Sequence, residues 1–229
     1  MADIKTEMLD YATNSSQASG FLARPKGDGP FPGVIVIQEW WGLNDNIKDI
    51  AQRFAAEGFA AFAPDLYHGK VTAEPDEAMK AMMALDMPRA VKEMVKAAEY
   101  LSQQPFTAGR GIGATGFCMG GGLALALATA SPRIKAVAPF YGANPDPIDN
   151  VATISGPVFA VYAEHDDWAG EGVRTALAQA LEKHGIKHEI KVYPGTEHAF
   201  FNDTRPEVFK KGAADDAWAR VLELFRAEL

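Results

Sequence analysis

The segment Gly116-Phe117-Cys118-Met119-Gly120 contains the only cysteine of the chain, in a setting that suits a nucleophile. It lies between a β-like run and an Ala/Leu-rich helical run, as in a nucleophile elbow with cysteine in place of serine. The turn from strand to helix is so tight that residues two positions away must lack bulk, which explains Gly116 and Gly120. A helix N-terminus also favours the reactive thiolate. The segment therefore predicts nucleophilic catalysis by Cys118, although a lone cysteine is more often a small buried hydrophobe.

The elements that must position this segment alternate along the chain between strand-like and helical patterns. Such alternation indicates βαβ units, and hence an α/β fold whose mostly parallel sheet has helices on both faces. The predicted strands are 34–37, 59–63, 111–117, 134–140, 157–163 and 188–193. The predicted helices are 47–54, 75–103 with an interruption at Pro88, 124–130, 173–181 and 214–225. Residues 3–24 alternate weakly and could form an antiparallel edge pair.

Two of the later strands are followed by residues that could assist a nucleophile. Asp166 follows the strand 157–163, and His198 follows the strand 188–193. Loops at the carboxyl ends of parallel strands meet at one edge of a sheet, and the order nucleophile, acid, histidine is the one expected with an elbow. His198 would take the thiol proton of Cys118 and later protonate the leaving group, while Asp166 would orient the imidazole.

The residues alone leave alternatives open at this edge. Asp167 and Glu164 are also candidates for the acid, and His165 could cap a helix or line the pocket. An isolated histidine in a polar loop is usually a solvated surface residue. Only the combination of cysteine, acid and histidine in the required order predicts a triad.

An oxyanion hole needs two backbone N–H groups close to the nucleophile. We expect them from Met119, which follows the nucleophile, and from Trp40, in the loop after the first long core strand. Glu39 in that loop is unusual, because a carboxylate beside an anionic nucleophile would be repelled. A solvated or salt-bridged loop acid is the simpler interpretation of Glu39.

Length and composition predict a single domain over residues 1–229. A chain of 229 residues that is 48% hydrophobic can form one sizeable core without disulfides or metals. A net charge of −8 without a Lys/Arg-dense stretch argues against nucleic acid and anionic membranes as partners. The chain shows no signal-peptide core and no apolar run of membrane-spanning length, so we expect a cytoplasmic protein.

Five sequence segments together resemble the dienelactone hydrolase family, the carboxymethylenebutenolidases, a branch of the α/β-hydrolase fold. They are QEWWGLN at 38–44, PDLYHG at 64–69, GFCMGGG at 116–122, FYG at 140–142 and YPGTEHAFFND at 193–203. The resemblance extends from about residue 10 to the C-terminal helix. It implies a triad of Cys118, Asp166 and His198, and it selects Asp166 over Asp167.

The resemblance also implies a role for Glu39 as the auxiliary glutamate that interacts with the resting thiol and gives way when substrate binds. Family members of this kind hydrolyse an enol lactone through an acyl-enzyme, without metal or cofactor and usually as monomers. The resemblance therefore implies a small-molecule ester or lactone as the substrate. The alternative from another class is a protein that binds a lactone without hydrolysing it.

The sequence departs from the family pattern where substrate is bound. Dienelactone hydrolases proper hold the substrate carboxylate with two arginines, one of them four residues beyond the catalytic histidine. That position is Asn202 here, and residues 70–85 contain no arginine. Lys70, Lys80 or Arg205 could substitute, although lysine lacks the bidentate fork that suits a carboxylate. The aromatic candidates for the pocket lining are Tyr67, Trp40, Trp41, Tyr141, Trp168 and Phe200.

Two other patterns do not indicate a cofactor or metal site. Gly111 to Gly116 match G-x-G-x-x-G, but this run is the strand before the elbow and no acid lies about twenty positions on, so a dinucleotide site is not expected. His184 and His188 have metal-ligand spacing, but Gly185 ends the helix between them. We expect no metal and no cofactor.

Overall fold

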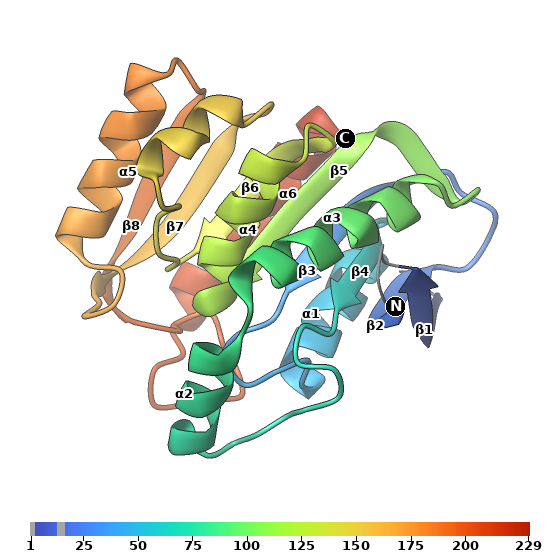
Figure 1. Ribbon diagram of the computed structural model, residues 1–229, viewed down its shortest axis with the longest axis horizontal. Coiled ribbons are helices and arrows are strands. Elements are labelled where there is room, and N and C mark those ends of the chain that lie inside the picture. The colour runs from blue at the N-terminus through green and yellow to red at the C-terminus, as the bar shows by residue number, and fades with distance from the viewer. Residues whose placement is uncertain (1–2, 13–16) are drawn as a thin grey trace.

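One twisted sheet of eight strands organises the protein, in the order β1-β2-β4-β3-β5-β6-β7-β8 (Figure 1). The computed structural model describes residues 3–12 and 17–229. The strands are β1 (Ile4–Ala12), β2 (Gln17–Pro25), β3 (Phe31–Ile37), β4 (Ala60–Pro64), β5 (Thr107–Phe117), β6 (Ile134–Phe140), β7 (Val158–His165) and β8 (His188–Glu197). The strands from β4 to β8 pair in parallel, whereas β1 with β2 and β2 with β4 are antiparallel. This arrangement confirms the mostly parallel sheet and the antiparallel edge pair.

Helices cover both faces of the sheet, as predicted (Figure 1). On one face lie α3 (Met87–Ser102), α4 (Met119–Ala130) and α5 (Glu171–Lys183), together with the short 3-10 helix η1 (Ile148–Thr153), which the sequence patterns did not predict. On the other face lie α1 (Asp45–Ala56) and α6 (Lys211–Glu228). The helix α2 (Pro75–Ala84) lies beyond the sheet edge (Figure 1).

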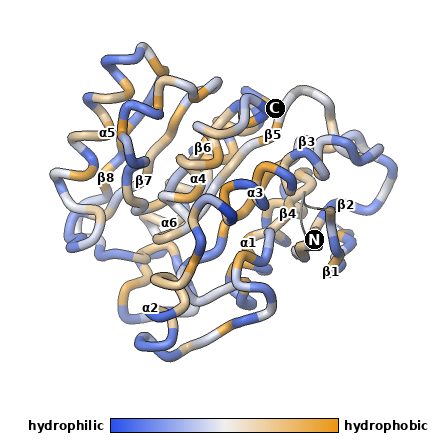
Figure 2. The backbone as a smooth tube through the Cα atoms, viewed as in Figure 1, coloured by the Kyte–Doolittle hydropathy of each residue, from blue (hydrophilic) through white to orange (hydrophobic). Residues whose placement is uncertain are grey.

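The core is formed by the central strands and the inward faces of the helices. All of β4 and the last five residues of β3 are buried, as expected for parallel strands covered on both faces. On the α1 and α6 side, the ring of Phe54 packs against Trp218 and Phe225 at centroid distances of 4.4 and 6.0 Å. Figure 2 shows the apolar residues concentrated along these central elements. The core holds the carboxyl ends of the strands in fixed positions relative to one another.

Among the element boundaries that differ from the prediction are the break between α2 and α3 and the end of β8. The segment 75–103 breaks at Leu85 and Asp86, before Pro88, because the Asp86 side chain caps α3 by accepting from the Arg89 N–H at 3.1 Å, and Pro88 occupies the first turn. Strand β8 continues through Pro194 to Glu197, so part of the predicted loop before His198 is strand. Among the described residues, no helix is both long and apolar enough to cross a lipid bilayer.

Candidate active site

Cys118 stands at a sharp turn between β5 and α4. Its φ of 57° and ψ of −120° are unusual for a residue with a side chain, and they turn the chain directly from strand into helix. A methyl group on Gly116 would lie 2.1 Å from the carbonyl oxygen of Gly120, and one on Gly120 would lie 2.4 Å from that of Gln38. Neither position can hold a larger residue without movement of backbone. The predicted elbow is therefore present, with Cys118 at its tip.

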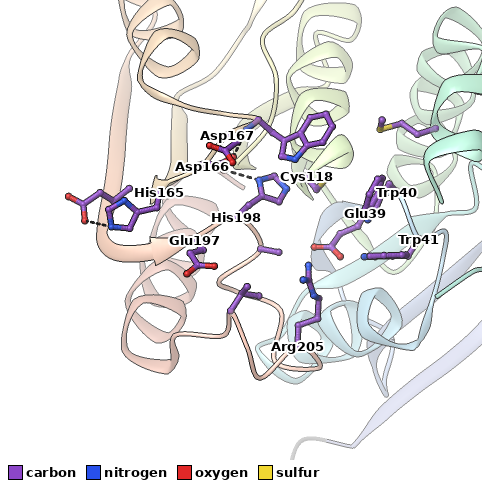
Figure 3. Close-up of a pocket in the computed structure, with 15 residues that line it drawn as sticks. Glu39, Trp40, Trp41, Cys118, His165, Asp166, Asp167, Glu197, His198 and Arg205 are labelled. Atoms are coloured by element: carbon purple, nitrogen blue, oxygen red, sulfur yellow. Dashed lines mark hydrogen bonds and ion pairs between the residues drawn. The ribbon is translucent and has the colours of Figure 1, made fainter. Parts of the chain in front are cut away.

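Asp166 and His198 are brought together by the carboxyl ends of β7 and β8. Oδ2 of Asp166 lies 2.8 Å from Nδ1 of His198, and the Asp166 side chain is fully buried. The other oxygen, Oδ1, accepts hydrogen bonds from the backbone N–H groups of Trp168 and Ala169, each at 2.9 Å. Three donors thus fix the carboxylate, and the carboxylate fixes the imidazole (Figure 3).

The electrostatics of this pair favour its charged form. Burial alone would lower the pKa of His198, but the hydrogen bond to Asp166 and the neighbouring Cys118 outweigh burial and raise that pKa to about 10. Burial alone would raise the pKa of Asp166, but His198 and the two backbone donors lower it overall. The second ring nitrogen of His198 is left to face Cys118, which lines the same pocket.

The other acids considered from the sequence have different positions. Oε2 of Glu164 accepts from the backbone N–H of Gly195 at 2.8 Å and lies 3.5 Å from Nε2 of His165. Asp167 is exposed. Both acids and His165 line the pocket, but the carboxylate bonded to His198 is that of Asp166.

Glu39 is a buried acid at the end of β3, with only 2% of its surface exposed. Its Oε2 accepts a hydrogen bond from the Asn202 side-chain amide at 3.1 Å. Burial raises the pKa of Glu39, while the charge on His198, the bond from Asn202, the charge on Arg205 and the indole of Trp41 partly offset this. Glu39 is thus not the solvated loop acid of the simpler interpretation.

Of the two predicted oxyanion-hole residues, Met119 directly follows the nucleophile and Trp40 lines the same pocket as the nucleophile. Met119 is the first residue of α4, and Trp40 occupies the turn after β3. Within the described part of the chain, neither backbone N–H donates to a protein acceptor. Both groups are therefore available to an incoming acceptor, as the prediction of an oxyanion hole requires.

A pocket of about 750 Å³ opens over Cys118, Glu39 and His198 (Figure 3). Of the predicted aromatic lining, Trp40, Trp41 and Trp168 are present. Sequence reasoning did not identify Glu197, Ala199 or Val208, which also line this pocket, although the place of Glu197 and Ala199 beside His198 could have indicated them.

Three predicted lining residues, Tyr67, Tyr141 and Phe200, are not part of the lining of this pocket. Phe200 is fully buried, and Tyr141 is only 1% exposed. The ring of Tyr141 packs on the His198 ring at a centroid distance of 4.9 Å, so it contacts the imidazole and helps to hold it in place. Tyr67 lines a separate groove, although its hydroxyl donates to the sulfur of Met119 at 3.4 Å.

The candidate cationic residues are divided between two places. Arg205 lines the main pocket, where its side chain points toward Glu39 (Figure 3). Lys70 and Lys80 line the separate groove and both bond to Glu77. Among the described residues, no group of three or more His, Cys, Asp or Glu side chains is arranged to hold a metal ion.

The doubly covered parallel sheet, the elbow after β5 and the acid and histidine after β7 and β8 define an α/β-hydrolase fold. A sequence profile of the Dienelactone hydrolase family matches residues 18–229, and the chain belongs to that family. Protein usf of Aquifex pyrophilus is 38% identical over 97% of this chain and 99% of its own length. A protein of Aquifex aeolicus, provisionally named a carboxymethylenebutenolidase, is 35% identical over the same shares of the two chains.

The solved structures give the same result. A crystal structure from Klebsiella pneumoniae, provisionally described as a dienelactone hydrolase, superposes with a TM-score of 0.89 and 27% identity, covering 97% of this chain and 98% of the other. The protein is therefore a hydrolase of the class that acts on carboxylic ester bonds.

Proposed function

We propose that the protein hydrolyses small activated cyclic esters, such as enol lactones, through a Cys118-His198-Asp166 triad and an acyl-enzyme. The observation that carries the proposal is the 2.8 Å contact between His198 and Asp166 at the edge of the pocket into which Cys118 opens. All three side chains come from one chain, so a monomer suffices for the reaction.

In the first half-reaction, the proton of the Cys118 thiol resides on His198. The raised pKa of His198, about 10, supports this assignment. The thiolate sulfur attacks the ester carbonyl carbon, and the negative charge that develops on the carbonyl oxygen is received by the N–H groups of Trp40 and Met119. The bond from carbon to the ring oxygen then breaks, and His198 gives its proton to the departing oxygen.

In the second half-reaction, water attacks the thioester carbonyl. His198, now neutral, accepts a proton from this water, and the bond between carbon and sulfur breaks to return the thiolate. Asp166 keeps the imidazole in one orientation and stabilises its positive form through both steps. Activated esters suit this chemistry. In the tetrahedral intermediate the thiolate itself leaves readily, so the acyl group is transferred to sulfur only when the other group also leaves easily, and an amine does not.

Glu39 has a separate part in the proposal. It lies in the same pocket as Cys118 and is buried, so its proton-bound form is favoured. A neutral carboxyl can donate a hydrogen bond to the sulfur, which would restrain the nucleophile until substrate enters. An ionised Glu39 would instead repel the thiolate.

The test is turnover of an activated ester by the wild type and by Cys118→Ala. We expect the wild type to release a burst of leaving group equal to the enzyme concentration, followed by steady turnover. We expect the variant to bind the ester and to lose both phases. Retention of turnover by Cys118→Ala contradicts the proposal, and stoichiometric binding without release by the wild type indicates a lactone-binding protein.

A further inference from the structure

The charges that line the pocket are unevenly distributed. Three carboxylates, those of Glu164, Asp167 and Glu197, lie on the side of β7 and β8 and are exposed to solvent. Exposed carboxyl groups are ionised near neutral pH. An anion that enters past this rim therefore meets like charges.

Arg205, the only arginine among the described residues of the lining, compensates for only part of this charge. Nε of Arg205 donates to Oε1 of Glu207 at 2.8 Å, so its charge is shared with a carboxylate outside the pocket. Its side chain is about one-third exposed, where solvent screens its attraction for a ligand.

The inner end of the pocket contains no free cation among the described residues. His198 is paired with Asp166, and the partner of Glu39 is the neutral amide of Asn202. A substrate carboxylate at this depth would lie beside Glu39 and the Cys118 sulfur. The positive charges near it, on Arg205 and His198, are already paired with Glu207 and Asp166, so they replace little of the water it loses.

The remaining walls are apolar. Met82 of α2 faces the pocket from one side, and Trp40, Trp41 and Trp168 contribute indole surface. Trp168 is 64% exposed, so an apolar group seated against it would bury surface that is now in water.

We propose that the pocket selects uncharged esters or lactones with an apolar body and discriminates against substrates that carry a carboxylate. The inference deepens the proposed function and depends on it, because it names the substrate class of the same site. The discrimination arises from the acidic rim at Asp167 and Glu197, from the neutral Asn202 amide inside, and from the apolar walls.

The experiment compares two enol lactones that differ at one group. The first carries a free carboxylate, and in the second that carboxylate is a methyl ester. We expect kcat/KM at the lactone carbonyl to be at least about tenfold higher for the neutral member. Higher ionic strength should raise kcat/KM for the acid, because salt screens repulsion between like charges, and should leave the neutral member unaffected. A preference for the acid, or a kcat/KM for the acid that falls with salt, would overturn the inference.

The second measurement uses the double variant Asp167→Asn, Glu197→Gln. We expect the ratio of kcat/KM for acid over neutral substrate to rise about threefold to tenfold, as expected for the loss of two solvent-screened repulsions. The control is Glu223→Gln, which removes an exposed acid on α6 away from the pocket and should leave the ratio unchanged. An unchanged ratio in the double variant contradicts the role of the rim.

These outcomes separate the inference from the proposed function. If neither lactone is hydrolysed, the proposed function fails. If both are hydrolysed and the acid is preferred, the proposed function stands and only the inference about substrate class fails.

Discussion

The side-chain amide of Asn202 donates a hydrogen bond to the buried carboxyl group of Glu39 at 3.1 Å. Burial raises the pKa of Glu39 from 4.5, and the charges on His198 and Arg205, together with the neutral Asn202 amide, offset the effect of burial only in part. The folded protein therefore holds a proton at Glu39 that the unfolded chain releases at lower pH. This contribution to stability is complete below pH 4.5 and is lost as the pH rises through the raised pKa of the folded state.

We expect Glu39→Gln to become more stable relative to the wild type as the pH rises above 4.5, because glutamine does not titrate. The measurement is the difference between urea unfolding free energies of the two proteins across a pH series, with Glu223→Gln as the exposed control. A difference that stays constant with pH would show that Glu39 does not hold a proton in the folded state.

Asp166→Asn tests the acid of the triad. We expect kcat/KM to fall by about 10²- to 10⁴-fold, because the amide no longer holds the imidazole in the correct orientation and tautomer. The wild type should also lose kcat/KM as the pH rises through about 10, where His198 gives up its proton. The residual activity of the variant should decline at a lower pH, because Asp166 raises the pKa of His198.

Asp167→Asn is the matched control for this substitution. It changes the neighbouring acid, which lacks the bond to His198, and should cost far less activity on a neutral ester. If the two variants lose activity equally, the acid has been misassigned.

The elbow makes a prediction about stability. Gly116→Ala places a methyl group 2.1 Å from the Gly120 carbonyl oxygen. The methyl carbon is attached directly to the backbone and the oxygen is part of it, so neither can move without a shift of the chain. We expect a loss of at least about 2 kcal/mol of unfolding free energy. In contrast, a methyl group on Gly172 in α5 meets nothing within 4 Å, and Gly172→Ala should gain about 0.5–1 kcal/mol. Equal thermal shifts for the two variants would contradict the close approach at the elbow.

Substitutions of Tyr141 show whether its ring or its hydroxyl group supports His198. Its ring packs on the imidazole, and its buried hydroxyl has no hydrogen-bond partner among the described residues. Tyr141→Phe should therefore retain or slightly increase stability, since it removes an unsatisfied polar group. Tyr141→Ala should cost about 3–5 kcal/mol and lower kcat. A loss above about 1 kcal/mol in Tyr141→Phe would mean that the hydroxyl is bonded.

The succession of strands and helices along the chain, and the elbow, could be predicted from the sequence alone. Apolar periodicity and paired glycines are local signals. It also predicted that Asp166 and His198 meet, since both follow parallel strands. The contents of the pocket were harder to predict. Phe200 and Tyr141 lie near strand ends like the true lining residues, and only three-dimensional packing shows that they point into the core.

The two contacts that define the inner pocket connect residues far apart in the chain. Asn202 bonds to Glu39 across 163 positions, and Met82 reaches the pocket from α2. No local sequence pattern predicts contacts between residues so far apart in the chain. The departure at Asn202 was visible in the sequence, but its use as the partner of Glu39 was not.

The central claim is that Cys118 is acylated during turnover, and the most direct measurement is the intact mass of the enzyme quenched in acid during steady turnover of an activated ester. The account predicts an added mass equal to the acyl group, located by peptide mapping on the peptide that contains Cys118. Steady turnover with an unmodified Cys118 peptide, or an adduct on another residue, would contradict it.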